Sequence, residues 1–81
     1  MKPTLRQRTV LEIMAPGNII SYHTQLRVAW LGGGEVHLAT LRALKARGWI
    51  EATEPLGPYE HYRITDAGRE AIGGPLRFGS R

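Results

Sequence analysis

LRALKARGWIE (Leu41–Glu51) and YRITDAGREAI (Tyr62–Ile72) are the two segments that decide the fold of this chain. In the first, leucines spaced to lie on one helix face predict a helix over about 35–47. We expect that helix to end at Gly48, because glycine adopts a left-handed backbone without steric cost. Trp49–Thr53 then has the composition of a strand. The first segment therefore predicts a helix that turns directly into a strand.

The second segment begins inside another predicted strand, Tyr59–Ile64, in which apolar and polar residues alternate. Pro55–Pro58 separates the two strands as a turn. Thr65 and Asp66 are typical helix-capping residues, and they predict a short final helix that runs to about Ile72. A β-hairpin followed by a helix is therefore expected at this end of the chain.

Two more helices are expected upstream. Thr4 and Gln7 have the spacing of a capping box, which opens a helix over about Leu5–Ala15. After a short strand at Ile19 and Ile20, Ser21 is expected to cap a second helix. One face of that helix would carry Tyr22, Leu26, Ala29 and Trp30. The glycines at 32–34 end it as a turn, and helix, turn and helix together form the skeleton of a helix-turn-helix.

The two quoted segments and the hairpin between them resemble the winged helix-turn-helix superfamily of prokaryotic regulators, especially its PadR-like and MarR-like branches. LRALKARGWIE resembles the end of a recognition helix that continues into the first wing strand. YRITDAGREAI resembles the second wing strand and the helix after it. The resemblance covers about Leu41–Ile72. The expected fold class is α+β: a small winged helix-turn-helix domain, with a three-helix core, a two-stranded β-wing and a short C-terminal helix.

The resemblance implies a DNA-binding transcription regulator of prokaryotic or phage origin, whose helix over 35–47 enters the major groove. A helix fits that groove, where exposed side chains reach base edges and cations meet phosphates. The expected DNA-binding residues are Arg27, Val36, Ala39, Thr40, Arg42, Ala43 and Arg47. The helix dipole alone is enough to explain cations in the last helical turn, such as Lys45 and Arg47, but explains Arg42 less well.

Two features depart from the DNA-binding pattern. The expected wing carries Glu51, Glu54 and Glu60, whose carboxylates are repelled by phosphates. No dimerisation helix is recognisable, so a homodimer is left open and would use the first helix, the tail or the wing tip. An alternative function is therefore a winged-helix protein-protein interaction module that does not bind DNA, with a protein partner docking at Leu56 and Tyr59 on the wing.

Composition agrees with double-stranded DNA as the partner. The 81 residues form one expected domain over 1–72, with a flexible basic tail over 73–81, and the net charge is +4. Most lysines and arginines precede Gly48, so a DNA surface is expected in the first half of the chain. No segment resembles a signal peptide or a membrane span, and we expect a cytoplasmic protein without contact to a membrane.

No catalytic residue, metal site or cofactor is expected, and the protein is not expected to be an enzyme. The chain has no cysteine, and its two serines lie in no nucleophile motif. His23, His37 and His61 lack the spacing of metal ligands, which favours ordinary surface or boundary positions. Aromatic residues are another candidate site, as a platform for single strands. We expect most of them, including Tyr22, Trp30 and Trp49, to lie in the core instead.

Overall fold

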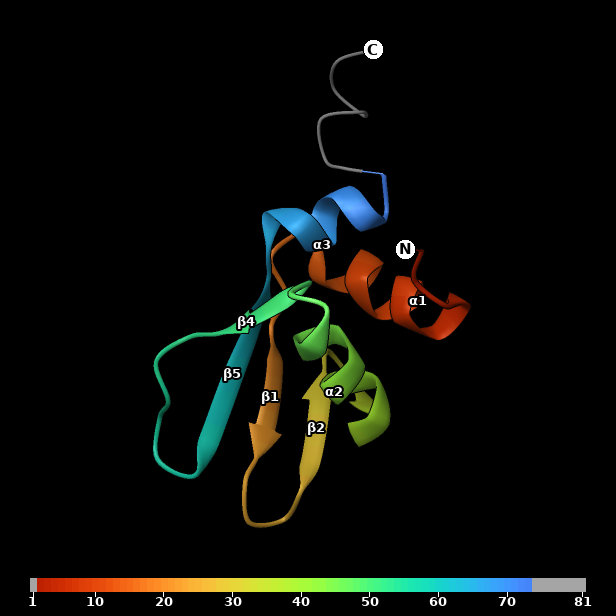
Figure 1. The fold of residues 1–81 in the computed structure, drawn as a ribbon. Helices are drawn as coiled ribbons and strands as arrows, with labels where there is room; N and C mark the ends of the chain where they lie inside the picture. Colours follow the sequence, from red (N-terminus) through yellow and green to blue (C-terminus); the bar gives the residue numbers. More distant parts are fainter. Residues whose placement is uncertain (1, 74–81) are drawn as a thin grey trace.

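The computed structural model describes residues 2–73 (Figure 1). Along the chain, its elements are α1 (Leu5–Met14), β1 (Ile20–His23), β2 (Val28–Leu31), β3 (Gly34–Val36), α2 (Leu38–Ala46), β4 (Ile50–Ala52), β5 (Tyr59–Ile64) and α3 (Asp66–Ala71). The strands form one antiparallel sheet in the order β3-β2-β1-β5-β4. Within residues 2–73, no helix is long and apolar enough to cross a membrane. The predicted tail falls almost wholly outside the described residues.

Strand pairing places one hydrophobic row across the sheet. Leu31 pairs with Ile20, Ile20 with Tyr62, and Tyr62 with Ala52, while Ile64 pairs with Ile50. Successive strand residues point to opposite faces, so these side chains share one face. They pack with Val10, Leu11 and Met14 of α1, with Leu41 and Leu44 of α2, and with Val36 and Trp49. The core therefore lies between one face of the sheet and the helices.

The predicted second helix is wrong. The chain from Ile20 to Leu31 forms the β1–β2 hairpin, and Figure 1 shows β1 lying beside β5. Tyr22 and Ala29 do share a face, but that face is a side of the sheet and not of a helix. Trp30 points to the opposite side and is 38% exposed, so its predicted place in the core is also wrong. The fold is a small α+β domain with three helices in the described residues instead of the expected four.

This segment forms a hairpin instead of the predicted helix because its residues suit a sheet better than a helix. Ile20, Tyr22, Val28 and Trp30 are β-branched or aromatic, and such side chains favour strands. The turn itself was hard to recognise because it contains no glycine. Arg27 adopts the left-handed conformation there, with φ 58°, at a cost of roughly 1 kcal/mol for a residue with a Cβ.

The predicted third helix starts too early. Gly34–Val36 forms the edge strand β3, so the glycine turn joins two strands and not two helices. His37 is the N-cap of α2 and makes no side-chain capping bond. The helix ends where predicted, with Arg47 as C-cap and Gly48 at φ 74°. The first half of a literal helix-turn-helix is therefore absent from the described chain.

The remaining elements agree with the sequence. Thr4 and Gln7 form the predicted capping box of α1. Thr65 caps α3 by accepting a 3.0 Å hydrogen bond from the Gly68 backbone N–H. The same Thr65 hydroxyl donates to the Gly48 carbonyl oxygen at 2.7 Å. One side chain thus joins the start of α3 to the turn that follows α2, which fixes β4 and β5 relative to α2.

Candidate nucleic-acid interface

Helix α2 packs one face into the core and leaves the opposite face open. Thr40, Leu41 and Leu44 are buried, at 8%, 4% and 0% exposed. One turn holds 3.6 residues, so the residues opposite this stripe fall together on the outer side. We define the outer face of α2 as Ala39, Arg42, Lys45 and Ala46, all of which are exposed. This face offers cations separated by small side chains.

The predicted DNA-binding residues separate into two groups. Ala39 and Arg42 lie on the outer face of α2, Ala43 lies half-buried at its border, and Arg47 is exposed at the C-cap. Val36 and Thr40 do not belong to an exposed site, since they are only 6% and 8% exposed. Val36 is in β3 and faces the core, and Thr40 shares the buried helix face with Leu44, four residues away, so these two residues are not part of the outer face of α2.

Arg27 lies apart from α2. It is exposed in the β1–β2 turn at the far end of the hairpin (Figure 1). Lys45 and Ala46 also belong to the outer face, although neither was among the predicted DNA-binding residues. They could have been found from Arg42, because residues three and four positions later lie on the same side of a helix.

Both cations after Arg42 contact aromatic rings. The Lys45 ammonium lies 5.1 Å from the centroid of the Tyr62 ring, and the Arg47 guanidinium lies 5.6 Å from that of Trp49. Trp49 is 7% exposed, as expected for a core residue. Cation–π contacts at exposed positions contribute about 0.5–1 kcal/mol and hold the charge in place. The contacts therefore orient part of the positive charge of α2 toward β5 and the start of β4.

The carboxylates of the wing differ in their surroundings. Glu51 accepts a 2.7 Å hydrogen bond from Arg63 Nε, which also makes an ion pair. Glu60 accepts a 2.5 Å hydrogen bond from the Tyr62 hydroxyl. Burial first, and then this bond and the charge of Glu60, raise the pKa of Tyr62 well above its ordinary value. Among residues 2–73, Glu54 makes no such pairing, so it is the wing carboxylate whose charge is least compensated.

The loop between β4 and β5 is tied to the β1–β2 turn. The Thr24 backbone N–H and hydroxyl both donate to the Pro58 carbonyl oxygen, each at 2.9 Å. Leu26 and Leu56 are 65% and 70% exposed in these two loops. The far end of the sheet is therefore a joined pair of loops with an exposed leucine in each.

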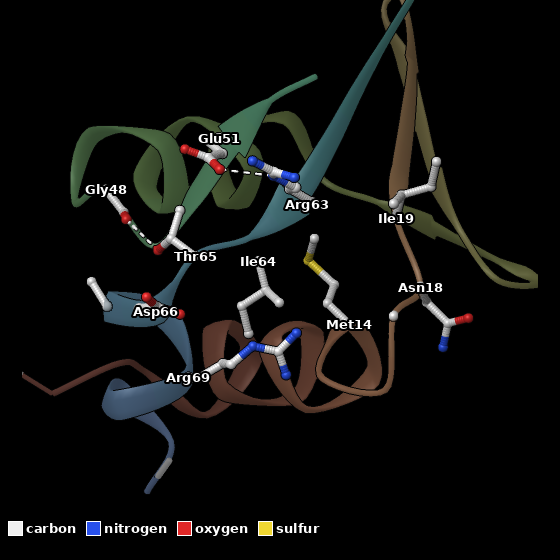
Figure 2. A pocket seen from close by; sticks show the side chains of 12 residues that line it. Met14, Asn18, Ile19, Gly48, Glu51, Arg63, Ile64, Thr65, Asp66 and Arg69 are labelled. Carbon is white, nitrogen blue, oxygen red and sulfur yellow. Dashed lines mark hydrogen bonds and ion pairs between the residues drawn. The ribbon is translucent and has the colours of Figure 1, made fainter. Parts of the chain in front are cut away.

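A hollow of about 720 Å³ lies at the other end of the sheet, between the C-terminal end of α1 and the start of α3 (Figure 2). Met14 and Ile64 line it with apolar atoms, while Arg69 reaches across from α3 and donates to the Ala15 carbonyl oxygen at 2.6 Å. The Arg63–Glu51 pair borders its other side. Both arginines that line the hollow have bonding partners within the chain.

The three histidines lie in β1, at the N-cap of α2 and in β5. Within residues 2–73, no group of three His, Cys, Asp or Glu side chains is placed to hold a metal ion. His23 Nδ1 accepts a 3.1 Å hydrogen bond from the Leu26 backbone N–H, and its ring meets Tyr59 edge-on at 4.9 Å. His61 lies on the outward side of β5, opposite to the side that carries Tyr62, and is half-buried there. The contacts of His23 and His61 are therefore with neighbouring residues of the sheet and its turn.

Comparisons of the chain with protein-family models, with curated proteins and with solved structures found no match. The function of the protein is therefore inferred from its own residues and their geometry.

Proposed function

We propose that this domain is a variant winged helix that binds duplex DNA through α2 and acts as a transcription regulator. The order of elements from α2 onward supports the proposal: helix, glycine turn, strand, loop, strand and helix, over the region that resembles the superfamily. The β1–β2 hairpin stands in the chain where the sequence predicted the first helix of a helix-turn-helix. It contributes Ala29 and Leu31 to the core on which α2 rests.

The observation that carries the proposal is the outer face of α2. From Leu38 to Arg47 the chain contains three cations and no carboxylate. Arg42 lies between Ala39 and Ala46, whose small side chains leave room for close approach to a groove. An arginine in the major groove can donate two hydrogen bonds to a guanine, and its charge also suits phosphates. We therefore assign base or phosphate contact to Arg42 and phosphate contact to Lys45 and Arg47.

The pairing of the wing carboxylates also favours this proposal. Glu51 and Glu60 lie beside Arg63 and the Tyr62–Lys45 pair, so their fields are partly compensated near the domain. Glu54 remains as a source of repulsion at the wing. We expect α2 to make the main contact and the wing to contribute little or nothing.

A titration of labelled duplex DNA, followed by fluorescence anisotropy at several salt concentrations, tests the proposal. Binding should weaken with salt, because each phosphate contact adds about −0.9 to the log–log slope. Arg42→Ala should lower affinity at least about fivefold. Arg6→Ala, which removes the same charge from an exposed position on α1, should change it much less. No binding at low salt, or equal losses in both variants, would disprove the assignment.

The alternative interaction module rests on the joined loops at the far end of the sheet. Leu26 and Leu56 are exposed there, and the Thr24–Pro58 bonds hold their loops together. Exposed apolar side chains that gather in one place mark contact sites for other proteins. This function predicts that Leu56→Asp abolishes capture of a protein partner while leaving DNA affinity unchanged.

A further inference from the structure

One face of the sheet is left uncovered by the described helices. The open sheet face is defined by Ser21, His23, Val28, Trp30, Tyr59 and His61, which alternate with the inward residues of β1, β2 and β5. Trp30 and Tyr59 are each 38% exposed, and the other four are half-buried. Uncovered aromatic side chains on a regular sheet are a surface that a flat partner can bury.

Strand register arranges these side chains in two rows across the central strand. Trp30 pairs with Ser21, and Ser21 pairs with His61. In the next row Val28 pairs with His23, and His23 pairs with Tyr59. The Tyr59 and His61 rings are stacked with their centroids 6.3 Å apart. Serine, the smallest side chain of the two rows, thus lies between two rings in the first row.

The charges on this face do not suit a nucleic acid. Among the described strand residues on this side, the cation is Arg63, which is already paired with Glu51. Glu35 stands beside Trp30 at the β3 edge. A phosphate backbone needs cations along its path, and stacking platforms for single strands combine rings with such cations. A neutral, aromatic partner fits the face better.

We propose that the open sheet face binds a second copy of this chain. The central strand of five is β1, so a two-fold axis parallel to β1 superposes all five strands of both copies. That axis places Ser21 opposite Ser21 and Trp30 opposite His61 of the second copy. Val28 likewise lies opposite Tyr59. His23 lies opposite His23 on the axis, so the contact between Val28 and Tyr59 pairs a small side chain with a large one, while Trp30 meets the ring of His61.

The expected interface is small. Strands about 4.8 Å apart make a five-stranded sheet roughly 20 Å wide. Specific interfaces bury about 800 Å² on each partner in the standard case. We expect a single sheet face of this width to bury less than that, which is typical of weak complexes. We therefore expect dissociation in the micromolar range, and the dimer does not depend on DNA binding.

Sedimentation equilibrium of the full chain tests the dimer. Mass should rise with concentration from that of a 9.0 kDa monomer to twice that value. Trp30→Glu and Ser21→Arg should each weaken the dimer at least tenfold while circular dichroism shows a folded domain. Leu5→Glu, at an 81% exposed position on α1, is the matched control and should leave the dimer unchanged. A monomer at every concentration, or a dimer sensitive only to Leu5→Glu, overturns the proposal.

Crosslinking locates the axis. The chain has no cysteine, so Ser21→Cys adds a single thiol. A bismaleimide that spans about 10 Å, the spacing of packed sheets, should join two Ser21→Cys chains efficiently. Ala46→Cys, on the other side of the sheet, should crosslink poorly. Equal crosslinking of the two overturns the axis. Binding of oligo(dT) that Trp30→Glu abolishes assigns the face to single-stranded nucleic acid instead. A monomer in which Ser21→Cys resists labelling assigns it to residues 74–81.

Discussion

The hydroxyl of Tyr62 donates a 2.5 Å hydrogen bond to Glu60 Oε1, and the Lys45 ammonium lies 5.1 Å from the centre of the same ring. Tyr62 is 2% exposed and belongs to the core, so the contact joins a wing strand, the core and the cationic end of α2. A tyrosine in this position has to keep its proton, because an anion would stand against Glu60 with little access to water.

Tyr62→Phe tests that requirement. At neutral pH the variant should lose about 1 kcal/mol of unfolding free energy with the hydrogen bond. Because folding raises the pKa of Tyr62, the wild-type protein should lose stability once pH exceeds about 10, where the unfolded tyrosine ionises and the folded one does not. The variant lacks that loss. The difference in unfolding free energy between wild type and variant, measured by urea unfolding, should therefore narrow as pH rises. A constant gap would contradict the raised pKa.

Gly68→Ala should destabilise the domain, against the usual preference of helices for alanine. A Cβ at this position would lie within 3 Å of two atoms, one of them the backbone carbonyl oxygen of Trp49. Overpacking of this kind costs about 1–3 kcal/mol, since backbone has to shift. Gly33→Ala is the matched control, because nothing lies within 4 Å of its Cβ. Thermal unfolding should separate the two variants; equal midpoints would contradict the close packing of α3 on the wing.

Arg27→Gly should change stability and DNA affinity in opposite directions. The left-handed backbone of Arg27 suits glycine, so relief of strain should raise unfolding free energy by roughly 0.5–1 kcal/mol. If Arg27 contacts a phosphate, the same variant should bind duplex DNA several-fold more weakly at low salt. Denaturant unfolding measures the change in stability, and fluorescence anisotropy on the same preparation measures the change in DNA affinity. A stabler variant with unchanged affinity removes Arg27 from the interface.

Glu54→Gln should strengthen duplex binding about two- to threefold at low salt, because it removes the least compensated wing carboxylate near a polyanion. The gain should disappear as salt rises. Glu70→Gln, at an exposed position on α3, provides the control for a general charge effect. The same gain in both variants would show that Glu54 does not face the DNA.

The sequence predicted the second half of the fold well because its determinants are local. Gly48 ends α2, Thr65 caps α3, and β5 has the boundaries that its alternation indicated. Each of these depends on side chains within a few positions. A single sequence is enough when a cap, a stop and a period agree.

The first hairpin could not be predicted in the same way. Tyr22, Leu26, Ala29 and Trp30 satisfy a helical spacing, although Leu26 lies in the turn and Trp30 on the opposite face from Tyr22 and Ala29. What decides the outcome is pairing of β1 with β5, nearly forty residues away. The turn has an arginine in the left-handed conformation, where a glycine or asparagine would have indicated a hairpin turn in the sequence.

The candidate site was predicted in part. Arg42 and Ala39 lie together on the outer face of α2, and Lys45 completes it. Thr40 was misplaced because its burial follows from a neighbour four residues on, and a polar side chain in that position looks exposed in sequence. Val36 was expected on the helix because the predicted helix began too early, and it lies in β3 instead. The open sheet face was missed altogether, since it exists only after three strands come together.

The outer face of α2 and the open sheet face lie on opposite sides of a single layer of strands. If both proposals hold, occupancy of one face would leave the other accessible. In the proposed dimer, two copies joined through their sheets would direct their α2 helices away from each other, toward separate stretches of duplex. Such a pair would not read two half-sites of one palindrome. It would hold distant sites of the same DNA molecule together as a loop, gaining strength from the high local concentration of the second site.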